Sequence, residues 1–147
     1  MNVFVHVQAK PGATAAEVEQ VWGSTPEPVA HGPKGLFVLM VDVFNAAGEA
    51  GQALAPHRPA ILDAVKDAFG AKELAELGPS ELELLEGDAL VNVTLRKQGI
   101  VLTTKDGIVA AAAWPASLTK ESLGDTVKLA AQTLANARAL NRPARAS

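Results

Sequence analysis

Three apolar segments that follow one another closely constrain the fold of this chain most strongly. They cover residues 89–95, 99–104 and 108–114, and Lys105-Asp106-Gly107 separates the second from the third. Asp-Gly between two such segments is a strong hairpin signal, because both residues tolerate positive φ. The segments therefore predict antiparallel strands. Residues 119–140 follow with apolar side chains at helical spacing, which predicts one long C-terminal helix.

The first half of the chain alternates between strand and helix patterns. Residues 2–8 alternate between apolar and polar, as in a half-buried strand. Thr14-Ala-Ala-Glu17 matches a capping box and predicts a short helix that stops at Gly23. The run 36–44 is almost entirely apolar, which is typical of a strand covered on both faces. Residues 59–69 carry one apolar stripe after Pro59 and predict a second helix.

These elements predict one α+β domain. Leu82 and Leu84 alternate with glutamates and complete a βαββαβ order over residues 1–87, which is the ferredoxin-like arrangement. Antiparallel hairpins and the long helix then occupy residues 88–142, and residues 143–147 form a frayed tail. A sheet with its helices on one face must cover the other face, either with its own added elements or with a second copy. We therefore expect a homodimer.

Composition excludes several classes of protein. The 147 residues contain no cysteine, which rules out disulfides, thiol nucleophiles, cysteine-ligated zinc and iron–sulfur clusters. Met1 to Gln8 lack the basic segment and the long apolar run of a signal peptide. No stretch of the chain reaches the 18 consecutive apolar residues of a membrane-spanning helix. We therefore expect a cytoplasmic protein that does not cross a membrane.

Charge is distributed unevenly along the chain. Residues 1–87 hold five Lys/Arg against twelve Asp/Glu, a net charge of −7, whereas residues 88–147 hold eight against four, a net charge of +4. Such a split either steers self-association or an anionic partner, or is plain surface variation. The basic half has a single aromatic residue, Trp114, so base-stacking surfaces are missing and nucleic-acid binding is disfavoured.

No familiar catalytic or cofactor motif is present. The three histidines, His6, His31 and His57, include no pair at the i, i+4 spacing of a helical metal site. The chain also lacks a G-x-S-x-G nucleophile elbow and a glycine-rich phosphate loop. We therefore expect neither a metal nor a cofactor.

A few polar residues are nevertheless candidates for a site. His6 shares a strand face with Phe4 and Gln8, and these three are the candidate ligand contacts if that face lines a cavity. Asp42 interrupts an apolar strand, and a buried carboxylate needs a partner or a raised pKa. His57 precedes a helix. His6, Asp42 and His57 are thus the candidate catalytic residues. The alternative for His6 is an exposed strand residue, for Asp42 a water-facing edge position, and for His57 a helix-capping or surface role.

Residues 3–86 resemble the antibiotic-biosynthesis-monooxygenase type of dimeric α+β barrel. The matching pieces are Ala9-Lys10-Pro11-Gly12 after the first strand and the stretch from Phe37–Phe44 to Pro56-His57-Arg58-Pro59-Ala60-Ile61-Leu62. The resemblance implies a cavity between sheet and helices that binds or oxidises a small organic molecule, or in some members degrades haem. The haem-degrading branch uses an Asn, a Trp and a His. His57 matches that His, but Asn2 lies too early and Trp22 on the wrong element, so this triad does not carry over.

Residues 90–140 are similar to the C-terminal half of proteins with the type III secretion chaperone-like fold. The matching pieces are Val91–Leu95, Ile108-Val109, Trp114-Pro115 and the helix entry Leu118–Leu123. The Gly99–Gly107 hairpin also resembles the roadblock-type domain. Both resemblances imply dimeric modules that bind partners without catalysis.

Two functions follow as hypotheses. The preferred one is a noncatalytic homodimeric protein that binds a protein partner or a small ligand, since no catalytic constellation is recognisable. The alternative is a small cofactor-independent enzyme of the dimeric-barrel type, with His6, Asp42 and His57 around a cavity.

Overall fold

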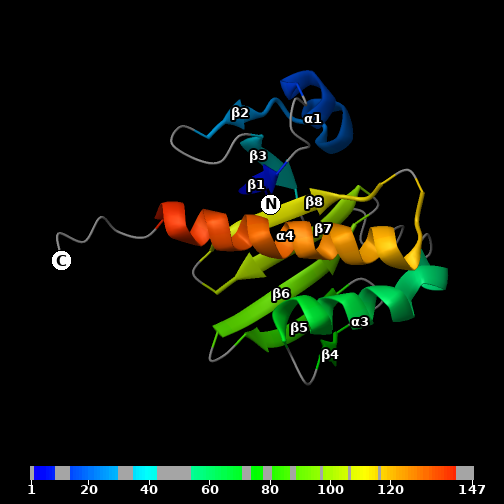
Figure 1. Ribbon diagram of the computed structural model, residues 1–147. Coiled ribbons are helices and arrows are strands. Elements are labelled where there is room, and N and C mark those ends of the chain that lie inside the picture. The colour runs from blue at the N-terminus through cyan, green and yellow to red at the C-terminus, as the bar shows by residue number, and fades with distance from the viewer. Residues whose placement is uncertain are drawn as a thin grey trace.

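A computed structural model of the chain shows a mixed α+β fold, with one eight-stranded sheet and helices on both of its faces (Figure 1). The structure describes residues 2–8, 14–29, 35–42, 54–70, 74–77, 81–86, 89–96, 98–105, 107–115 and 117–141. Three α-helices and one short 3-10 helix, η1 (Ala55–His57), lie within these ranges.

The strand order across the sheet is β2-β3-β1-β8-β7-β6-β5-β4. In chain order the strands are β1 (Asn2–Gln8), β2 (Glu27–Pro28), β3 (Leu36–Asp42), β4 (Ala75–Glu76), β5 (Glu81–Glu86), β6 (Ala89–Leu95), β7 (Gly99–Thr104) and β8 (Val109–Ala113). Every neighbouring pair is antiparallel except β1 and β8, which run parallel with His6 opposite Ala110 and Val7 opposite Ala111. An N-terminal group of strands and a C-terminal antiparallel group therefore meet along one parallel seam.

The helices divide between the two faces of the sheet. Helix α1 (Ala15–Trp22) packs on one face, whereas α3 (Arg58–Phe69) and α4 (Lys120–Asn141) lie side by side on the other (Figure 1). Strand residues alternate between the two cores accordingly: Ile100 joins the core under α3 and α4, and its neighbour Val101 joins the core under α1. Two hydrophobic layers thus hold one sheet between them.

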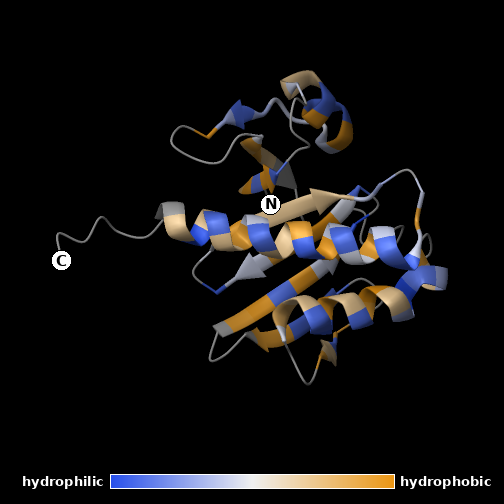
Figure 2. Ribbon diagram, viewed as in Figure 1, coloured by the Kyte–Doolittle hydropathy of each residue, from blue (hydrophilic) through white to orange (hydrophobic). Residues whose placement is uncertain are grey.

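The long C-terminal helix is anchored by the apolar stripe that the sequence predicts. Its members are each at most 1% exposed: Leu123, Val127, Ala130, Leu134 and Ala137. Burying one Val or Leu side chain contributes about 1.5–3 kcal/mol, so this stripe is the main attachment of α4 to the sheet. Hydrophilic and hydrophobic bands alternate along α3 and α4, as expected of helices with one buried face (Figure 2).

Helix α1 begins and ends as its sequence indicates, with one difference. The Thr14 hydroxyl accepts a hydrogen bond from the Glu17 backbone N–H at 3.3 Å, and Gly23 ends the helix with a φ of 78°. The other half of the predicted capping box is missing, because no described residue forms a hydrogen bond or ion pair with the Glu17 carboxylate. One Thr–backbone bond is therefore enough to start this helix.

The strand pairing differs from the predicted ferredoxin-like arrangement. A split βαβ core would carry its helices on one face, but α1 and α3 lie on opposite faces here. The parallel neighbour of β1 is β8, from the C-terminal half, while β3 pairs with β1 antiparallel. An order of elements along the chain does not specify which strands become neighbours, because many pairings satisfy the same local pattern.

Most of the other predicted elements are confirmed within a few residues. Strands β5, β6 and β7 and helices α3 and α4 occupy the predicted segments. The structure also contains two strands of two residues each, β2 at Glu27–Pro28 and β4 at Ala75–Glu76. Met40 is 44% exposed, so β3 is covered on both faces only in part. The predicted tail at 143–147 lies outside the described residues.

Candidate functional site

A cleft opens at the carboxyl ends of the two parallel strands β1 and β8. The chain leaves β1 toward α1 on one face of the sheet and leaves β8 toward α4 on the other face. The ends of the two strands are therefore flanked by one helix above the sheet and one below it. In open sheets, the crevice outside such carboxyl ends, where connections diverge to opposite faces, is the usual place for a ligand.

This α1–α4 cleft has a volume of about 520 Å³. Cavities of about 300–1,000 Å³ are typical of small-molecule sites. The cleft is lined by Val7, Gln8, Glu17, Val18, Val21, Trp22, Ala113, Trp114, Pro115, Ser122, Asp125, Thr126 and Leu129. Most of these side chains are apolar, so the cleft offers a largely hydrophobic surface with a few polar groups.

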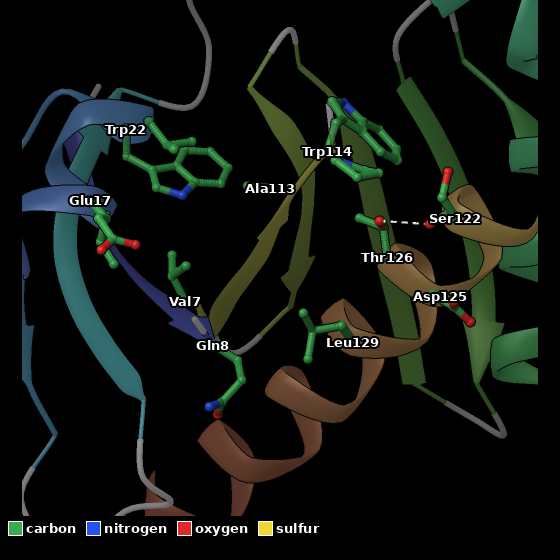
Figure 3. A pocket seen from close by; sticks show the side chains of 13 residues that line it. Val7, Gln8, Glu17, Trp22, Ala113, Trp114, Ser122, Asp125, Thr126 and Leu129 are labelled. Atoms are coloured by element: carbon green, nitrogen blue, oxygen red, sulfur yellow. Dashed lines mark hydrogen bonds between the residues drawn. The ribbon is translucent and has the colours of Figure 1, made fainter. Parts of the chain in front are cut away.

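Two indoles line opposite sides of the cleft. Trp22 from the end of α1 and Trp114 from the end of β8 lie on opposite sides (Figure 3). The Trp114 Nε1–H donates a hydrogen bond to the backbone carbonyl of Arg96 at 2.8 Å, which fixes that ring. Trp22 is 6% exposed, and no described residue accepts a hydrogen bond from its Nε1–H. Trp22 thus brings both an apolar face and a free donor to the cleft.

Exposed apolar side chains extend this surface beyond the indoles. Leu129 of α4 is 37% exposed and Val21 of α1 is 40% exposed, and both line the cleft. Leu129 lies near Gln8, below the two indoles in this view (Figure 3). Both residues occupy regular helices, whose apolar side chains normally face the core. A ligand bound in the cleft would cover both of these side chains.

The ionisable groups of the cleft are both acidic. Glu17 and Asp125 line it, and no Lys or Arg is among its described lining residues. The Glu17 carboxylate points from α1 toward the cleft, whereas the Asp125 carboxylate points away from the two indoles (Figure 3). Although residues 88–147 carry a net positive charge, the charged residue that they place among the described lining residues is acidic, namely Asp125.

The hydroxyl groups of the cleft serve the start of α4. Ser122 Oγ donates to the carbonyl of Ser117 at 2.8 Å, and Thr119 N–H donates to Ser122 Oγ at 2.8 Å. Thr126 Oγ1 donates to the carbonyl of Ser122 at 2.8 Å (Figure 3). Since each hydroxyl proton already has an acceptor, these groups hold the helix in place and can offer a ligand only lone pairs.

The structure separates the ligand contacts predicted from sequence. Gln8 lines the cleft, but Phe4 and His6 do not. Phe4 is 63% exposed, and His6 Nδ1 donates to the carbonyl of Val109 at 3.3 Å. His6 therefore supports the seam between β1 and β8.

The three candidate catalytic residues do not meet in the cleft. Neither His6 nor His57 is among the described lining residues, and the side chain of Asp42 lies outside the part of the chain that the structure describes. Asp42 lies opposite Asn2, at the other end of β1 from Gln8, and six residues of strand span about 20 Å. His57 precedes α3 and makes no side-chain cap bond there. A catalytic role for these three residues stays a prediction, and the cleft does not depend on it.

Sequence reasoning missed most of the cleft. The sequence pattern places Glu17 in a capping box, Trp22 on the apolar face of a short helix and Trp114 at the end of a strand, and it does not single out Leu129. One signal was available: Trp22 and Trp114 are the only two tryptophans of the chain, and each stands at the end of an element. Tryptophan is favoured where an apolar body meets a polar rim.

Within the described residues, no group of three or more His, Asp or Glu side chains is arranged to hold a metal ion. None of the described helices has the length and apolar character needed to cross a membrane. No known protein family, curated protein or solved structure matches this chain. The resemblances drawn from its motifs stay predictions, and the function rests on the geometry of the cleft.

Proposed function

We propose that this protein binds a small organic molecule in the α1–α4 cleft without transforming it. The observation that carries the proposal is the position of the cleft, at the carboxyl ends of the parallel strands β1 and β8 and between helices on opposite faces. Because β1 and β8 are held by the sheet, the floor of such a site is formed before a ligand arrives.

The lining supports a ligand with an apolar body. Trp22, Trp114 and Leu129 surround the space with aromatic and aliphatic surface. Transfer of apolar ligand surface from water into such a space is favourable by about 25 cal/mol per Å². The polar groups of the lining that can orient such a ligand are the Trp22 Nε1–H and the Glu17 carboxylate. A cleft of this composition and volume suits a small organic molecule.

The same lining favours binding over catalysis. No described histidine lines the cleft, and Ser122 uses its hydroxyl for the start of α4. A nucleophile with a base at hydrogen-bond distance, the minimum for acyl transfer, is not formed by the described residues of the cleft. The cofactor-independent enzyme is therefore the less favoured of the two functions.

The homodimer stays a prediction. Phe4 and Met40 lie opposite each other on β1 and β3, and both are exposed. Beyond them the sheet ends in β2, a strand of two residues, Glu27 and Pro28. A short edge that contains a charge and a proline discourages strand pairing between molecules. If a second copy binds, we expect it to pack on the face around Phe4 and Met40.

Binding is tested by the indole N–H signals of ¹⁵N-labelled protein. The chain has two tryptophans, and both line the cleft, so two signals report on it. We expect small aromatic compounds to shift both signals. Native mass spectrometry of freshly purified protein would show a ligand retained from the host as added mass.

A variant that fills the cleft provides the control. Leu129→Trp replaces an aliphatic side chain by a larger indole, which fills part of the cleft. Because Leu129 is partly exposed, the helix should keep its fold. We expect it to abolish the shifts of Trp22 and Trp114. Leu85→Trp is the matched control, because Leu85 is 58% exposed on β5 and does not line the cleft. Equal binding by both variants would contradict the proposed site.

A further inference from the structure

We infer that the ligand of the α1–α4 cleft carries a positively charged nitrogen, which binds against the Glu17 carboxylate while its apolar body lies between Trp22 and Trp114. This inference rests on the proposed function and adds the charge class of the ligand. It starts from the carboxylate of Glu17, which lines an apolar cleft and has no described partner.

The carboxylate of Glu17, an exposed residue, is not used by the helix that carries it. In a capping box, the acidic residue at this position reaches back to the backbone N–H of the N-cap residue. Here the Thr14 hydroxyl makes its half of the motif, but the Glu17 carboxylate does not, and it points toward the cleft (Figure 3). The side chain is thus available to a ligand at the rim of the indole-lined space.

The balance of charge around the cleft is negative. First-turn residues of α1 and α4, Glu17 and Ser122, line the cleft, so the amino ends of both helices lie beside it, each with about half a positive charge. Glu17 and Asp125 contribute two full negative charges, and no Lys or Arg is among the described lining residues. The first-turn N–H groups of Glu17 and Ser122 are also occupied by Thr14 and Thr119. An anionic ligand would therefore meet repulsion.

The aromatic walls favour the same charge. Indole faces attract cations through the negative charge above and below the ring, and tryptophan does so most strongly. Trp22 and Trp114 lie on opposite sides of the cleft, so a small organic ammonium ion would contact at least one of them while it pairs with Glu17. A carboxylate beside two indoles suits an aryl-alkyl amine.

Three probes of one shape and different charge test this inference. They are 2-phenylethylammonium, the neutral 2-phenylethanol and the anionic 3-phenylpropionate. Titrations follow the indole N–H signals of Trp22 and Trp114. We expect the ammonium ion to bind about fivefold tighter than the alcohol, as for a partly exposed ion pair, and the anion to bind weakest. The difference should shrink in 1 M salt, where screening acts within about 3 Å.

Variants assign the preference to a residue. Glu17→Gln should bring the ammonium ion and the alcohol to the same affinity, and Asp125→Asn should reduce the difference less. Glu19→Gln is the matched control: Glu19 is exposed on the same helix and does not line the cleft, so this variant should keep the full preference. Circular dichroism checks that each variant is folded.

The outcomes separate this inference from the proposed function. If the alcohol binds as tightly as the ammonium ion, or the anion binds tightest, the charge class is wrong while the cleft remains a binding site. If Glu17→Gln keeps the preference and Asp125→Asn removes it, the assignment to Glu17 is wrong. If none of the probes shifts either indole signal, both the charge class and the proposed aromatic-binding site are overturned.

Discussion

The indole N–H of Trp114 donates a hydrogen bond to the backbone carbonyl of Arg96, eighteen residues earlier in the chain, at a distance of 2.8 Å. This bond ties the exit of β8 to the exit of β6, two strands that are separated in the sheet by β7. Trp114 is half-buried and Arg96 is buried, so water cannot easily replace the bond. One wall of the cleft is therefore attached to the sheet by more than packing.

Trp114→Phe should destabilise the protein by about 1–2 kcal/mol. The substitution keeps an aromatic ring but leaves the carbonyl of Arg96 without its indole donor, and a buried acceptor without a partner costs about 1–3 kcal/mol. Urea unfolding followed by circular dichroism measures the loss. Trp22→Phe is the comparison: no described residue accepts from the Trp22 indole, so only packing should be lost there. Equal losses in the two variants would show that the Trp114 bond contributes little.

Gly99→Ala should be strongly destabilising, by about 1–3 kcal/mol or more. Gly99 pairs with Ala113 at the start of β7, and a Cβ at this position would overlap the carbonyl oxygen of Ala112. Gly99 and Ala112 are both buried, and the carbonyl oxygen belongs to the backbone and cannot move aside as a side chain could. The two strands would therefore have to separate. Gly124→Ala is the matched control in α4, where a Cβ meets nothing within 4 Å. It should stabilise the helix by about 0.5–1 kcal/mol. The melting temperatures should therefore move in opposite directions.

His6→Ala should lower stability without removing ligand binding. The His6 imidazole donates to the carbonyl of Val109 across the seam of β1 and β8, and its loss should cost about 0.5–1.5 kcal/mol. His57→Ala should be nearly neutral, since His57 makes no cap bond at α3. Denaturant titration measures both effects, and the indole signals report binding. Loss of binding in a folded His6→Ala protein would contradict this prediction and indicate that His6 takes part in ligand binding.

Phe4 and Met40 should determine whether a dimer forms. Replacing both by Ser removes an exposed apolar pair on β1 and β3, so we expect a dimer to dissociate into monomers. Sedimentation equilibrium measures the mass. Leu85→Ser is the control, because Leu85 is equally exposed but lies on β5. A wild-type protein that is monomeric at high concentration would refute the predicted dimer.

The sequence alone determined the local elements. The apolar segments predicted β6 and β7 with their observed bounds, and Thr14 and Gly23 marked the limits of α1. Such signals act over a few residues: a side chain caps the nearest backbone group, and a glycine adopts the turn beside it. The apolar stripe of α4 was equally readable, because helical spacing is a property of the segment itself.

The tertiary structure alone decided the cleft. It exists because β1 pairs in parallel with β8, so that His6 lies opposite Ala110, and because α1 and α4 then leave on opposite faces. About a hundred residues separate these partners in the chain, and a strand pattern states that a segment will pair without stating with which neighbour. Trp22 and Trp114 therefore meet across one cleft only through the pairing of β1 with β8, since no interaction local to either tryptophan brings them together.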